Sequence, residues 1–157
     1  MPAFVLALLA AQAAAAVCPA RPLIPTELAG WTTPVSVAAR AAPTMIRVGQ
    51  AARATLLPGG AFIYPLAPAK PGADGTSGGV FAFEALLTGR YRVALGAGAW
   101  IDVVRDGAAL ASVQHGHGGA CSTVRKMVDF DLTAGRHLLQ IAGSPTAMLT
   151  IMVVRVR

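Results

Sequence analysis

The sequence predicts an all-β fold, an antiparallel β-sandwich that resembles a jelly roll, with about nine short strands after an irregular N-terminal segment. Three observations predict it. Short apolar runs recur after Gly79 with turn residues between them. Several runs alternate apolar and polar residues with the period of a strand. Segments with helical periodicity are few, and no internal repeat is evident.

Residues 1–16 contain no charged residue and have the pattern of a signal peptide. Their apolar run is shorter than the roughly 20 residues that a bilayer span needs, and Ala14, Ala15 and Ala16 supply small residues for cleavage. We therefore expect a periplasmic or secreted protein with no transmembrane span after cleavage. An apolar N-terminal helix and a lipid anchor at Cys18 are the alternatives.

The mature chain of 141 residues is expected to form one domain, because its length lies in the usual range for one core. Prolines at five positions interrupt residues 17–43, so this segment is predicted to be irregular. The β-sandwich is expected over residues 44–157. Its candidate strands are residues 45–48, 51–57, 80–87, 90–95, 100–105, 108–115, 124–132, 137–142 and 147–156.

A long loop rich in proline and glycine is expected between residues 58 and 79, with room for one short strand at 61–66. Further along, residues 90–95 alternate, so that Arg90 and Arg92 are predicted to face outward from the sheet. The same pattern in residues 124–132 turns the acidic residues Asp129 and Asp131 outward.

Two turns predict hairpins. Asp106-Gly107 favours a two-residue type I′ turn, and residues 133–135 fit a three-residue hairpin with Gly135 in the left-handed region.

The net charge of +6 arises from 13 basic and 7 acidic residues. Because the basic residues are scattered, with Arg125-Lys126 as their one adjacent pair, the pattern argues against nucleic-acid binding. The charge favours solubility and some attraction to anionic polymers of the cell envelope. The expected partner is an unidentified envelope or extracellular ligand, and the oligomeric state stays open.

The two cysteines, Cys18 and Cys121, are expected to form a disulfide, because exported proteins fold in an oxidising compartment. In the chain-entropy model a loop of about 100 residues gives roughly 4.7 kcal/mol of stabilisation.

A histidine-rich segment offers a candidate metal site. In a strand, His115 and His117 would point to the same side and could converge on one ion, with His137 or Cys121 as a third ligand. The segment from His115 to Cys121 resembles the first motif of the cupins with Cys in place of Glu, and residues 133–137 resemble the second. This resemblance implies one Fe or Zn ion. The alternative is a glycine-rich loop, without a cofactor, whose histidines cover the turn.

Other catalytic signatures are missing from the sequence, including Gly-x-Ser-x-Gly, a phosphate loop and His-Glu-x-x-His. Asp102 lies in an apolar run, where Arg92 or Arg125 is expected to pair with it. Trp31 and Tyr64 lie in irregular segments and are candidates for a ligand-binding platform, whereas Trp100 is expected in the core.

The segments Gly-Arg-Tyr-Arg-Val-Ala-Leu (89–95), Trp-Ile-Asp-Val-Val-Arg-Asp-Gly (100–107) and Phe-Asp-Leu-Thr-Ala-Gly-Arg-His-Leu-Leu-Gln-Ile (130–141) resemble the bacterial pre-peptidase C-terminal type of sandwich. That resemblance implies an exported accessory or binding domain without catalytic residues. The second of these segments, with His-Gly-His-Gly-x-x-Cys (115–121) and Arg-Lys-Met-Val-Asp-Phe-Asp-Leu (125–132), is also similar to short exported bacterial proteins, some of which carry the label homogentisate 1,2-dioxygenase.

The sequence thus predicts an exported, non-enzymatic β-sandwich with an accessory or ligand-binding role. The alternative is a metal-dependent, cupin-like dioxygenase that uses His115, His117 and His137.

Overall fold

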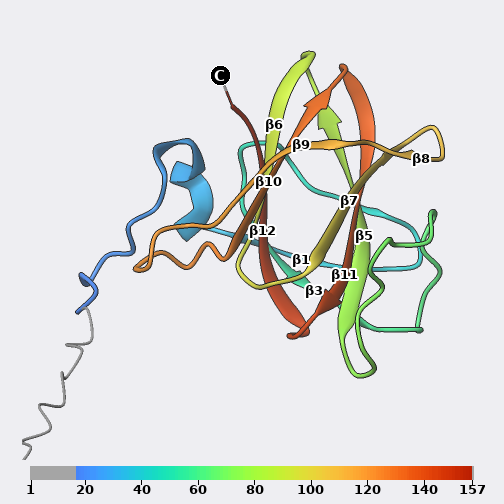
Figure 1. Cartoon of the computed structure of the whole chain (residues 1–157), viewed down its shortest axis with the longest axis horizontal. Coiled ribbons are helices and arrows are strands. Elements are labelled where there is room, and N and C mark those ends of the chain that lie inside the picture. Colours follow the sequence, from blue (N-terminus) through green and yellow to red (C-terminus); the bar gives the residue numbers. More distant parts are fainter. Residues whose placement is uncertain (1–16, 157) are drawn as a thin grey trace, which may run out of the picture.

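The computed structural model describes residues 17–156, which form two packed β-sheets with a short helix on one side (Figure 1). Sheet A has the strand order β1 (Val35–Ala38), β3 (Ala52–Thr55), β12 (Met148–Arg155), β6 (Gly89–Leu95), β10 (Lys126–Leu132) and β9 (Ser112–Gly116). Sheet B has the order β2 (Thr44–Met45), β5 (Ser77–Ala85), β11 (Gly135–Ser144), β7 (Trp100–Arg105) and β8 (Ala108–Ala109), and β4 (Leu57–Pro58) pairs with β5. The predicted all-β sandwich is confirmed.

The core between the sheets follows from the alternation seen in the sequence. Tyr91, Val93 and Leu95 of β6 are buried, as are Phe81 and Phe83 of β5. Apolar side chains that alternate in this way fill the space between two sheets from both inner faces. The expectation that the charged residues face water is confirmed for Arg90 and Asp131, whose side chains are exposed, and is wrong for Asp129, which is buried opposite Arg92 in the register of β6 and β10.

The chain passes repeatedly from one sheet to the other, and this corrects one of the two predicted hairpins. Residues 133–135 join β10 of sheet A to β11 of sheet B, so they bridge the two sheets although Gly135 has the expected positive φ of 123°. The Asp106-Gly107 hairpin is confirmed. It joins β7 to β8, with φ values of 52° and 76° in the left-handed region.

Other strand boundaries differ from the sequence predictions because tertiary pairing decides them. Residues 108–115, expected as one strand, divide into β8 of sheet B and β9 of sheet A. Residues 61–66 form no strand. The segment 17–43 is not irregular throughout, since Val35–Ala38 forms β1 by parallel pairing with β3.

The same segment contains the 3₁₀ helix η1 (Thr26–Thr32), which lies beside the outer face of sheet A (Figure 1). Leu28 and Trp31 of η1 are buried there against Ala94, Met152 and other outward residues of sheet A. This second apolar cluster explains why part of that face carries apolar side chains.

The expected disulfide joins Cys18 to Cys121, with 5.3 Å between the Cα atoms. The expected signal peptide lies outside the described residues. Within residues 17–156, no helix has both the length and the apolar character that a membrane crossing requires.

Candidate anion-binding site

The three histidines of the predicted metal site do not come together. His115 and His117 lie at the end of β9 in sheet A, where both side chains are exposed. The His115 ring contacts the Ser112 hydroxyl at 2.9 Å, and Nδ1 of His117 donates to the Arg125 carbonyl oxygen at 2.8 Å. Both rings therefore have protein partners at the surface.

His137 lies in β11 of sheet B and is buried, stacked on Phe83 with 5.5 Å between the ring centroids. Its Nδ1 donates to the Gly135 carbonyl oxygen at 3.0 Å, and its Nε2 is buried without a partner. Burial lowers the pKa of His137, because the charged imidazolium is poorly solvated there. Cys121, the other proposed ligand, is in the disulfide. Within residues 17–156, no three His, Cys, Asp or Glu side chains are placed to hold one metal ion.

The tryptophans exchange the positions expected from the sequence. Trp31, the candidate platform, is only 3% exposed, and its Nε1 donates to the Thr123 hydroxyl at 2.8 Å. Its ring is thus not available to a ligand. Trp100, expected in the core, is only partly buried at the start of β7.

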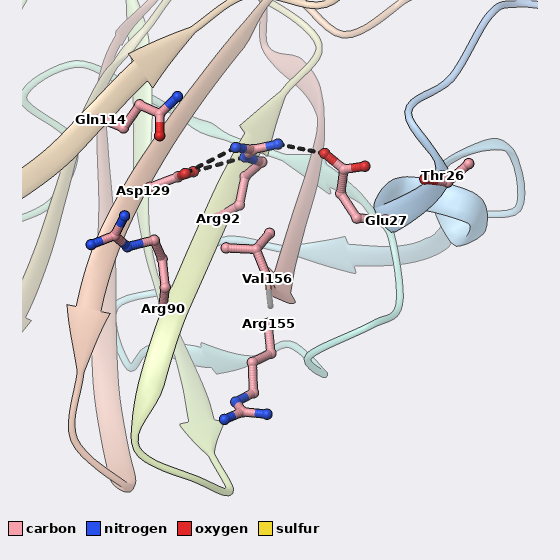
Figure 2. A pocket seen from close by; sticks show the side chains of 8 residues that line it. All are labelled: Thr26, Glu27, Arg90, Arg92, Gln114, Asp129, Arg155 and Val156. Carbon is pink, nitrogen blue, oxygen red and sulfur yellow. Dashed lines mark hydrogen bonds and ion pairs between the residues drawn. The ribbon is translucent and has the colours of Figure 1, made fainter.

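A groove of about 670 Å³ lies on the outer face of sheet A (Figure 2). Arg92 occupies its centre and lies between Asp129 and Glu27, which comes from η1. The guanidinium of Arg92 donates to both carboxylate oxygens of Asp129, at 2.7 and 2.9 Å, and also to Glu27. Arg90 makes the same bidentate contact with Asp131, at 2.9 and 3.0 Å.

In this arginine ladder, which we define as Arg90, Arg92, Asp129, Asp131 and Glu27, three carboxylates pair with two guanidiniums. The hydrogen bond to Asp131 and the charge of that carboxylate raise the pKa of Arg90, and Asp129 does the same for Arg92. Asp129 is only 2% exposed, so its pairing with Arg92 replaces the water that a buried carboxylate lacks. The ladder therefore fastens η1 and β10 to β6, and its guanidiniums are already occupied.

A different cationic cluster lies where β7 and β10 begin. The ammonium groups of Lys70 and Lys126 lie 4.9 and 5.3 Å from the centroid of the Trp100 ring, within the range of cation–π attraction. Gly72, Gly98, Ala99, Ala142 and Gly143 complete a hollow of about 390 Å³ around them, which we call the lysine hollow.

Three separate segments bring these side chains together. Trp100 pairs with Ala142 of β11, and Lys126 is the first residue of β10. Lys70 lies in the long loop of residues 59–76, which is fixed to sheet B at two points. The buried Gln140 side chain exchanges two hydrogen bonds with the Leu66 backbone, at 2.9 and 3.0 Å, and the Tyr64 hydroxyl donates to the Ile141 carbonyl oxygen at 2.9 Å.

Asp102 lies close to this cluster, with Trp100 as its hydrogen-bond partner in place of the arginine expected from the sequence. Nε1 of Trp100 donates to Oδ1 of Asp102 at 2.9 Å, and Oδ2 is buried without a partner. Burial and the Asp102 charge both raise the pKa of Tyr64. The hydrogen bond to Asp102 therefore fixes the orientation of the indole ring.

Neither lysine is in an ion pair within the described part of the chain. Lys126 donates one hydrogen bond to the Ala99 carbonyl oxygen at 2.6 Å. Its pKa is lowered, first by burial and second by the nearby charge of Lys70, while Asp102 acts in the opposite direction. Two ammonium groups thus repel each other across a hollow that an anion would neutralise.

The sequence contained a signal for this site, the rarity of lysine, which the total count of basic residues does not show. Lys70 and Lys126 are the only two lysines in the chain, against 11 arginines, and both lie against the same tryptophan. Comparison of the chain with protein-family models, with curated proteins and with solved structures finds no match.

Proposed function

We propose that this protein is an exported, non-enzymatic binding protein that takes an anionic ligand between Lys70 and Lys126, beside Trp100. The observation that carries the proposal is the convergence of both lysines of the chain on one indole ring, with no ion pair to an acidic side chain of residues 17–156. A bound anion relieves the repulsion between the ammonium groups and accepts hydrogen bonds from both.

The residue types suit reversible binding. An ammonium on a flexible stem donates in several directions, so it can adapt to a carboxylate, a sulfate or a phosphate without the fixed fork of an arginine. Trp100 lines the hollow together with glycines and alanines, whose small size leaves room for a ligand beside the indole.

Export is supported by the Cys18–Cys121 disulfide, since such bonds persist in oxidising compartments. The competing proposal, a dioxygenase that holds iron or zinc, has no three-residue ligand group behind it within residues 17–156. A stoichiometric, chelator-sensitive metal that is lost in His115→Ala would favour the dioxygenase.

Nitrogen-15 NMR tests the binding proposal with galacturonate as the probe. The Trp100 indole N–H resonance is expected to shift during the titration, and the resonance of the buried Trp31 is expected to stay in place. Lys70→Met and Lys126→Met should each weaken binding about tenfold, as expected for the loss of one charged hydrogen bond.

Arg53→Met is the matched control, because it removes the same charge from an exposed position of β3. Equal weakening by all three variants would show that galacturonate responds to net charge alone and would refute the site.

A further inference from the structure

Two further hollows adjoin the lysine hollow. One, of about 280 Å³, is lined by Tyr64, Asp74, Thr76 and Ser77, and we call it the hydroxyl hollow. It shares Gly72 and Gly143 with the lysine hollow. The other, of about 190 Å³, is lined by His115, His117 and Met127, and we call it the histidine hollow. It shares Lys126 with the lysine hollow.

Two glycines form the boundary between the hydroxyl hollow and the lysine hollow. A Cβ atom on Gly72 would lie 2.4 Å from the Cα atom of Gly143, and one on Gly143 would lie 3.0 Å from the Cα atom of Gly72. Both glycines have positive φ, at 91° and 67°. The two backbones therefore touch directly, and the Thr76 hydroxyl, 2.7 Å from the position of a Cβ on Gly72, is the side-chain group beside their contact.

The chemistry changes along these hollows. The hydroxyl hollow offers hydroxyls, of which those of Tyr64 and Thr76 donate to backbone carbonyl oxygens and keep their lone pairs as acceptors. The lysine hollow offers two cations and an indole, and the histidine hollow offers two imidazoles that each have one nitrogen bonded to the protein. Such a succession suits a ligand of several units, in which sugar hydroxyls, a carboxylate and an aromatic-stacking face each meet a suitable partner.

We infer that the three hollows form one track for an acidic oligosaccharide, with a carboxylate of its middle unit between Lys70 and Lys126. This inference rests on the proposed function and adds to it the class of ligand. A sugar acid is favoured over an acidic peptide, because the hydroxyl-bearing side chains that line the hydroxyl hollow can exchange hydrogen bonds with sugar hydroxyls.

One residue of the hydroxyl hollow, at one end of the track, allows the inference to be tested. Asp74 is the only carboxylate that lines the three hollows within the described residues, and its side chain is exposed. A polyanion that extends into the hydroxyl hollow would contact and be repelled by Asp74, whereas Asp74 does not line the lysine hollow, where a single sugar acid would bind.

Isothermal titration calorimetry with galacturonate and with its hexamer separates the two proposals. We expect the hexamer to bind at least about tenfold more tightly than the monomer, because additional subsites add affinity within one molecule. Asp74→Asn should tighten hexamer binding about threefold and His117→Ala should weaken it by a similar factor, and neither should change monomer binding. Asp106→Asn, at the opposite end of β7 with a side chain that is 91% exposed, is the control and should change neither.

Failure of monomer and hexamer alike would refute the proposed function. Monomer binding without a gain for the hexamer would refute only the track. A hexaglutamate peptide that binds as tightly as the hexamer would overturn the choice of a saccharide.

Discussion

The molecule has two cationic clusters, and they differ in whether acidic side chains form ion pairs with their basic residues. The arginines of the ladder on sheet A each hold a carboxylate through two hydrogen bonds. The lysines beside Trp100 have no acidic partner within ion-pair distance among the described residues. The ladder lines the larger of these two hollows, yet the smaller one contains the ammonium groups that have no ion pair within the described residues.

The difference shows that neither cavity size nor the number of basic residues identifies a binding site in this protein. Arginine and carboxylate match in geometry, so a bidentate pair is difficult for a ligand anion to displace. Lysines held apart from acids keep their hydrogen-bonding capacity for an incoming group. The ladder is therefore expected to govern stability and the lysine hollow to govern binding.

The largest expected effect concerns the ladder. Asp129→Asn removes the buried carboxylate from Arg92, whose side chain is 17% exposed, and leaves only Glu27 to offset its charge, so it should lower the free energy of unfolding by roughly 3 kcal/mol. Urea denaturation measures the change. Galacturonate affinity should be unchanged in this variant at temperatures where it is folded.

Asp131→Asn is the matched control, because the same bidentate geometry exists there at the exposed end of the ladder. The decrease in the free energy of unfolding should be clearly smaller for this variant, since solvent screens an exposed pair. Equal losses of unfolding free energy in the two variants would mean that burial does not distinguish the Arg92–Asp129 pair from the Arg90–Asp131 pair.

A smaller effect is expected from pH. Because the pKa of Lys126 is lowered, its ammonium loses its proton as the pH rises toward the ordinary lysine value of 10.5, and galacturonate affinity should fall with it, by about tenfold. Folding responds in the opposite direction. The unfolded chain binds the proton more tightly than the folded chain, so this group makes stability rise through the same window.

Lys70→Met removes one of the two causes of the lowered Lys126 pKa, so the loss of residual affinity should move to higher pH. Titrations of the wild type and the variant between pH 7 and pH 11 would show the shift. An unchanged midpoint would place the two ammonium groups too far apart to share a ligand.

The smallest effect is expected for stability at the lysine hollow. Lys70→Met should change the free energy of unfolding by less than about 0.5 kcal/mol, because the exposed side chain has no ion pair or hydrogen bond in the described structure. Thermal and urea unfolding would measure it. A loss comparable to that of Asp129→Asn would make Lys70 part of the framework and remove the distinction between the clusters.

The fold was largely predictable because its information is local. Alternation in β6 and β10 placed Tyr91 inside and Arg92 outside, and Asp106-Gly107 determined a hairpin. The connection at residues 133–135 was predicted wrongly, because a glycine with positive φ fits both a hairpin and a crossing between sheets. Only the pairing of β10 and β11 with other strands distinguishes them.

The candidate site was not predictable, because its parts are distant in the sequence and close only after folding. Lys70 lies in a loop without periodicity, and its position depends on the hydrogen bonds between Leu66 and Gln140. The two tryptophans were assigned the wrong environments for a related reason. Trp31 is buried by the outer face of sheet A, which the sequence predicted to be polar.

The Cys18–Cys121 bond has a consequence for ligand recognition. Together with the hydrogen bonds from Trp31 to Thr123 and from the Leu23 amide to the Cys121 carbonyl oxygen, it holds the connection that leads directly into Lys126. A cation held in place before its ligand arrives loses little conformational entropy on binding. Oxidation of the thiols thus prepares the lysine hollow in advance, and the reduced protein should bind galacturonate with a larger entropic penalty.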